Sequence, residues 1–256
     1  MTVKKASLYL FSLPIAVFLF REALDLVKPL LEPITKMDFM MMDKVIFAIG
    51  LLILVYTLKL QRQCGLVFKA NWRTLPLYWP LALIVVLTLT TGVNTDTSGL
   101  TLAKIFLTML AVGVGEELMF RGLVFHWFRD VSVRKQILIS AFSFGGIHLL
   151  GLTSSIDTAI ILSQVYFAAA VGVIFGYARA RDFSIMIPIM VHGLFDFITL
   201  GSKGGVAEAA SSVPTAQVVI GVLTVGTIAW AWGIFLLLKA GKKSNLTSPA
   251  SNVSTI

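Results

Sequence analysis

Long apolar segments recur along the whole chain and decide what it can fold into. Each is about 20 residues long, the length that a helix needs to cross a bilayer. Only 13% of the 256 residues are charged, about half the share in soluble domains. We therefore predict an all-α integral membrane protein with about eight transmembrane helices, at 7–27, 39–58, 75–93, 102–125, 136–152, 156–178, 183–200 and 216–238.

The first segment also has features of a signal peptide, because Lys4 and Lys5 precede the apolar run Leu8–Phe20. No small-x-small cleavage site follows that run, so we favour a retained helix.

The distribution of Lys and Arg predicts the orientation. If the N-terminus is cytoplasmic, 15 of the 21 basic residues fall in cytoplasmic pieces and only five in outer pieces. Cytoplasmic loops carry an excess of Lys and Arg. We expect both termini in the cytoplasm and a multi-pass protein of a prokaryotic cell membrane.

The chain shows no internal repeat, so we expect one membrane domain over 1–243. The stretch 201–215 is typical of an outer loop, and 244–256 of a disordered tail. Cys64 is the only cysteine, which excludes a disulfide scaffold. The net charge of +8 is dispersed between apolar runs. That favours contact with the lipid bilayer and argues against nucleic acid as a partner.

Polar residues inside apolar helices are costly and usually functional. The fourth segment contains Glu116, Glu117 and Arg121. Because i and i+4 share a helix face, Glu117 can pair with Arg121, whereas Glu116 points elsewhere. The alternative is that the helix ends here and both acids are hydrated at the interface.

Two later segments carry histidines. His148 lies 12 residues beyond Gln136, about 18 Å along its helix. His192 and Asp196 share a face of the seventh segment. Each cluster alone could be a hydrogen bond between helices, and His192 with Asp196 could be a proton relay. Since Glu116, His148 and His192 fall at comparable depth, we predict one site rather than three separate contacts.

These residues also form three ordered motifs. EELMFR (Glu116 to Arg121) fits EExxxR, FGGIH (Phe144 to His148) fits FxxxH, and HGLFD (His192 to Asp196) fits HxxxN/D. In these motifs the chain resembles the CPBP family, which contains type-II CAAX prenyl proteases and bacteriocin-processing or self-immunity proteins. The matching core runs from about residue 100 to 200.

The resemblance implies an intramembrane endopeptidase. By motif, Glu116 is the general base that activates water and His148 its partner. His192 and Asp196 support the oxyanion or fix the site. An ionised Asp cannot donate a hydrogen bond, so Asp196 is either protonated or orients His192.

Glu117 and Arg121 are, by the same resemblance, the supporting ion pair, with Phe144 as a further supporting residue. The chain has no HExxH or GxGD motif, and no motif marks a serine nucleophile. Those absences argue against other classes of intramembrane protease.

Zinc is possible, because Glu116, His148 and His192 could bind it with water in the fourth position. A zinc metalloprotease would then need a separate base. We favour a glutamate mechanism without a cofactor.

Membrane-embedded or lipidated peptides are the expected substrates, including CAAX proteins, leader peptides and C-terminal anchors. Two alternatives remain. A non-catalytic peptide-binding or immunity protein would be expected to lack Glu116 or one of the histidines, and these residues are all present. A proton-coupled transporter should show repeat symmetry, and none is evident.

Overall fold

The computed structural model describes residues 35–67, 71–90, 92–153, 156–204 and 214–240, with scattered residues between Tyr9 and Leu26. Every regular element among these residues is helical. They are α2 (Lys36–Thr57), η2 (Trp72–Tyr78), α3 (Trp79–Thr90), α4 (Gly99–Glu117), η3 (Leu118–Val124), α5 (Phe125–Trp127), α6 (Val133–Ile147), η4 (His148–Thr153), α7 (Thr158–Arg181), α8 (Met186–Gly201) and α10 (Thr215–Ala240).

Six helical stretches in the described residues are long and apolar enough to cross a membrane, and α8 is a shorter apolar helix. Seven of the eight predicted segments thus coincide with helices. The predicted segment 7–27 lies mostly outside the described residues, as do most of the loop 201–215 and all of the tail 244–256. The chain is therefore an all-α, multi-pass membrane protein, and its orientation stays a prediction.

Side chains set where several helices begin. Ser98 caps α4 by accepting a hydrogen bond from the Thr101 backbone N–H, and Asp157 caps α7 through Ala159. Such acceptors satisfy backbone donors that have no partner within the helix. The predicted segment from 183 becomes helical only at Met186, whose N–H donates to the Ser184 hydroxyl.

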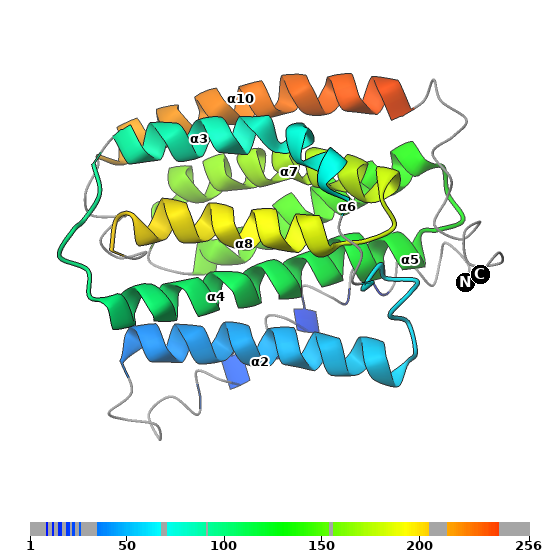
Figure 1. Cartoon of the computed structure of the whole chain (residues 1–256), viewed down its shortest axis with the longest axis horizontal. Coiled ribbons are helices and arrows are strands. Elements are labelled where there is room, and N and C mark those ends of the chain that lie inside the picture. Colours follow the sequence, from blue (N-terminus) through cyan, green and yellow to red (C-terminus); the bar gives the residue numbers. More distant parts are fainter. Residues whose placement is uncertain are drawn as a thin grey trace.

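The helices pack in a layered bundle in which α4 lies between α2 and α8, while α7 packs against α6 and α10 (Figure 1). Close approach of α6 and α7 depends on two glycines. A Cβ at Gly172 would lie 2.8 Å from the Ala141 Cα, and one at Gly145 would lie 2.8 Å from the Ala169 Cβ. Small residues let helices approach closely in membranes.

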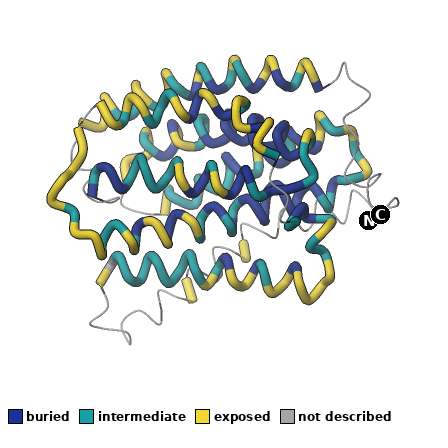
Figure 2. Tube along the Cα trace, viewed as in Figure 1, coloured by how far each residue is buried: buried dark blue, intermediate teal, exposed yellow. Residues whose placement is uncertain are grey.

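Burial is concentrated on α7 and on the segment that follows α4, whereas few residues of α2 and α10 are buried (Figure 2). The exposed side chains of α10 include Ile220, Leu223, Ile234 and Leu238. Apolar side chains on an outer helix face suit contact with lipid.

A π-helical segment, η3, follows directly after Glu117 and is buried throughout. The Ser140 hydroxyl donates to the Phe120 carbonyl at 3.0 Å, and Arg179 Nε donates to the Arg121 carbonyl at 3.0 Å. These bonds from α6 and α7 occupy backbone acceptors of η3. Short π-helical segments inside α-helices are frequent at functional sites.

Candidate active site

The predicted pair between Glu117 and Arg121 is present and completely buried. Arg121 Nη1 donates to Glu117 Oε1 at 2.9 Å, and neither side chain is exposed. The guanidinium carbon lies 4.4 Å from the centre of the Phe144 ring and 5.1 Å from that of Phe175. Aromatic faces attract cations, so this arginine is held by one acid and two rings.

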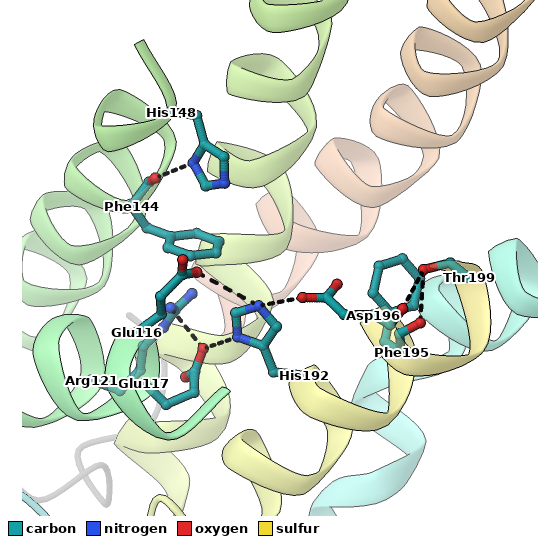
Figure 3. Close-up of polar contacts among 9 residues, drawn as sticks. All are labelled: Glu116, Glu117, Arg121, Phe144, His148, His192, Phe195, Asp196 and Thr199. Carbon is teal, nitrogen blue, oxygen red and sulfur yellow. Dashed lines mark hydrogen bonds and ion pairs between the residues drawn. The ribbon is translucent and has the colours of Figure 1, made fainter. Parts of the chain in front are cut away.

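His192 joins the first and third motifs. Its Nδ1 lies 2.9 Å from Glu117 Oε1, while its Nε2 lies 3.4 Å from Asp196 Oδ2 and 3.7 Å from Glu116 Oε2 (Figure 3). Three carboxylates thus surround one imidazole. Since a carboxylate accepts, Nδ1 is the donor toward Glu117.

Glu116 and Glu117 have different surroundings although they are adjacent. The Glu117 side chain has no exposed surface, whereas that of Glu116 is 25% exposed. The predicted divergence of the two acids is therefore present. Glu117 fixes Arg121 and His192, and Glu116 is accessible from a cavity.

His148 was predicted to lie inside a long helix, and this prediction is wrong. Helix α6 ends at Ile147, and His148 is its C-cap and the first residue of η4. Its Nδ1 lies 2.8 Å from the Phe144 carbonyl oxygen (Figure 3). A carbonyl can only accept, so Nδ1 carries the proton, and Nε2 of the neutral ring is free to accept one.

Phe144 connects the polar groups through its ring. Its centre lies 5.3 Å from that of His148 and 5.8 Å from that of His192, both nearly perpendicular. Edge-to-face packing of this kind restrains ring orientation. The motif residue Phe144 therefore separates the two histidines and covers Arg121.

The site opens into two adjoining chambers, of about 320 Å³ and about 200 Å³. Both are lined by Lys44, Val112, Glu116, His148 and Gln164. His192 and Asp196 line the larger chamber only. Glu116 and His148 thus lie where the two chambers meet.

Zinc would require Glu116, His148 and His192 to converge on one point. In the described part of the chain, no three His, Cys, Asp or Glu side chains are grouped so that they could hold a metal ion. The Nδ1 atoms of His148 and His192 bond to the Phe144 carbonyl and to Glu117. Metal ligands commonly make such bonds through their second ring nitrogen, so only Nε2 of each ring could reach a metal. Because the described side chains do not converge in this way, the arrangement does not fit zinc.

Sequence reasoning missed three features of the site. It did not connect Glu117 with His192, and it overlooked Lys44 and Gln164 in the chamber walls. Gln164 left a signal, because it is a polar residue within the uncharged run 159–178. The approach of Glu117 to His192 left none, because the residues are 75 positions apart.

The fold and the site define a multi-pass helical membrane protein with a buried cluster of acids and histidines. Residues 98–198 match the family described as Rce1-like, type II CAAX prenyl endopeptidase Rce1-like. The chain therefore carries a domain of this type II CAAX prenyl endopeptidase (CPBP) family, which implies a protease. No curated protein and no solved structure matches the chain.

Proposed function

We propose that this chain is an intramembrane endopeptidase of the glutamate type. The observation that carries the proposal is the position of Glu116. Its carboxylate lies where the two chambers meet, beside His148, with one oxygen 3.7 Å from His192 Nε2. It is the accessible member of the acid pair, as a group that must reach water has to be.

Glu116 acts as the general base. It takes a proton from water while the water oxygen attacks the carbonyl carbon of the scissile peptide bond. A carboxylate suits this work when water can reach it within hydrogen-bond distance, as the 25% exposure of the Glu116 side chain allows. His148 accepts or returns a proton through Nε2, since Nδ1 is held by the Phe144 carbonyl.

The buried residues orient the base. Arg121 holds Glu117, Glu117 holds His192, and His192 faces Glu116. Asp196 approaches the same ring nitrogen as Glu116, at 3.4 Å. We therefore assign His192 and Asp196 to fixing the site. This chain of contacts restrains Glu116 through its Oε2 atom and leaves Oε1 available to water.

The proposed substrate is a membrane-embedded or lipidated peptide. The chambers are lined by apolar side chains, among them Phe47, Met109, Met119, Phe167 and Phe195. We place the chain in the membrane as a single domain over 1–243 with both termini cytoplasmic. A prenylated CAAX protein, a leader peptide and a C-terminal anchor all fit this description.

Replacement of Glu116 tests the proposal. Membranes containing the wild type or Glu116→Gln should differ in peptides that accumulate uncleaved, as measured by quantitative mass spectrometry. Loss of a general base costs about 10²- to 10⁴-fold in rate. The variant should keep its normal level and melting temperature, because the amide preserves the shape of the side chain.

Asp96→Asn is the matched control, since Asp96 is an exposed acid in a turn and lines neither chamber. It should leave the peptide pattern unchanged. If Glu116→Gln retains most of the cleavage, the assignment of Glu116 is wrong.

A further inference from the structure

Gln164 is a polar residue on an apolar stripe that faces the larger chamber. Helix α7 contributes Gln164, Phe167, Ala168, Val171 and Phe175 to the chamber wall. These positions follow the helical repeat of three and four residues. Gln164 is the only one of them with a polar side chain, and it lines both chambers beside Glu116 and His148.

Packing does not account for this side chain. Within the described residues the Gln164 amide has no hydrogen bond, and the residue is exposed. A glutamine that only joined two helices would bond to the neighbouring helix. Its two N–H donors are instead available to a molecule in the cavity.

Hydrolysis needs a donor for the oxyanion that develops on the scissile carbonyl oxygen. The other polar groups of the junction are already engaged. His192 Nδ1 faces Glu117, and His192 Nε2 faces Asp196 and Glu116. His148 donates through Nδ1 to Phe144. The Lys44 ammonium lies 3.0 Å from Asp43 Oδ2.

We propose that Gln164 is a further catalytic residue, which donates a hydrogen bond from its amide to the scissile carbonyl oxygen. This inference rests on the proposed function. Glu116 takes one proton from water, and the water oxygen bonds to the carbonyl carbon. The π electrons of the C=O bond move onto the oxygen, where the Gln164 N–H stabilises the negative charge.

The hydrolysis needs no reactant other than the peptide and one water. When the tetrahedral intermediate collapses, the C=O bond reforms and the C–N bond breaks. The leaving amine takes the proton that Glu116 holds. One peptide and one water yield one carboxylic acid and one amine, and Gln164 neither gains nor loses a proton.

The test uses the full-length protein in lipid nanodiscs. The probe is the membrane peptide whose cleavage depends on Glu116, together with the aldehyde of the same sequence, whose hydrate resembles the tetrahedral intermediate. Gln164→Ala should lower kcat by about 10²- to 10³-fold, the usual effect of losing one oxyanion donor. KM should change by less than about threefold, because the donor acts on charge formed in the transition state.

Gln164→Glu retains the size of the side chain but loses its donors when ionised, so it should be as slow as Gln164→Ala. Both variants should bind the aldehyde more weakly than the wild type while binding the uncleaved peptide normally. A residue with only a structural role would not separate these two affinities. Gln217→Ala, an exposed glutamine at the start of α10, is the matched control and should match the wild type.

The outcomes separate this inference from the proposed function. If Glu116→Gln is inactive but Gln164→Ala keeps its kcat, the protease stands and the role of Gln164 is refuted. A large kcat loss in Lys44→Met with none in Gln164→Ala would assign the donor to Lys44. If no peptide depends on Glu116, the proposed function fails and this role falls with it.

Discussion

Arg121 and Arg179 are both almost completely buried, with 0% and 1% of their surface exposed, yet their surroundings differ. Arg121 pairs with an acid and, through Glu117, reaches His192 and a cavity. Arg179 donates to the backbone carbonyls of Arg121, Asp182 and Gln63. We call the first region the acid–histidine site and the second the Arg179 cage.

The Arg179 cage joins segments distant in sequence. Besides the arginine, the Ile185 N–H donates to the Gly65 carbonyl at 2.9 Å, and the Ser184 hydroxyl donates to the Val67 carbonyl at 2.7 Å. Gly65 has φ +74°, and a Cβ there would collide with the Phe183 carbonyl oxygen. The loop after α2 is thereby fixed to the turn before α8.

A buried charge does not by itself mark a functional site. In the cage, dipolar carbonyls surround the cation, and none of its members lines the described chambers. In the acid–histidine site, three acids face one imidazole, and two of them, Glu116 and Asp196, remain accessible. Groups of like charge that are held close together beside a cavity are typical of catalytic sites.

Arg121→Met should give the larger loss of stability. It leaves Glu117 buried without its cation, and breaking a buried ion pair costs about 3–5 kcal/mol. The melting temperature in detergent and the amount of folded protein should both fall. In the double variant Glu117→Gln with Arg121→Met, no stranded acid remains, so it should be more stable than the single variant. Equal stability would contradict the ion-pair account.

Arg179→Met should cost less, because it strands no opposite charge. It removes three charge-assisted hydrogen bonds, each worth about 1.5–3 kcal/mol, but it also removes the cost of burying the cation. In limited proteolysis, we expect the 60–67 loop of this variant to be cut before the rest of the protein unfolds. Arg179→Lys keeps the charge and should be intermediate. A drop in cleavage rate with no change in loop protection would contradict the separation of the two regions.

The thiol of Cys64, beneath the cage, should be unreactive in the folded protein. Burial raises its pKa to about 12, against a small opposing effect of Arg179. The neutral thiol is the form favoured by folding, so its contribution to stability is complete below the ordinary pKa near 9. That contribution is lost as the pH rises from about 9 toward 12.

Maleimide labelling at pH 8 measures this effect, since the thiolate is the reactive form. Cys64 should label only as the protein unfolds. Asp96→Cys in a Cys64→Ser background provides an exposed thiol that should label at once. Rapid labelling of Cys64 in the folded wild type would show that the cage is open.

Removal of metal should have the smallest effect. If Glu116 is the base, extended chelation followed by assay in metal-free buffer should change the cleavage rate by less than about twofold. A zinc enzyme would lose activity, since the ion generates the nucleophile. Stoichiometric zinc that is lost and regained together with activity would overturn the glutamate mechanism while leaving the protease in place.

Local patterns in the sequence predicted much of this architecture. Apolar length predicted seven helices that the structure describes. The i,i+4 spacing predicted that Glu117 meets Arg121, and the same spacing placed Asp196 beside His192. These features depend on the helical repeat alone, which is a property of neighbouring residues.

Tertiary structure decided the rest, because it depends on how helices cross. Only packing of α4 against α8 brings Glu117 to His192, and only the break between α6 and η4 places His148 at the junction of the chambers. The same holds for the π-helical segment after Glu117, where Ser140 and Arg179 reach carbonyls from other helices. Helix crossings follow from the fit of many side chains, such as Ala141 against Gly172, and no short pattern in the sequence contains that information.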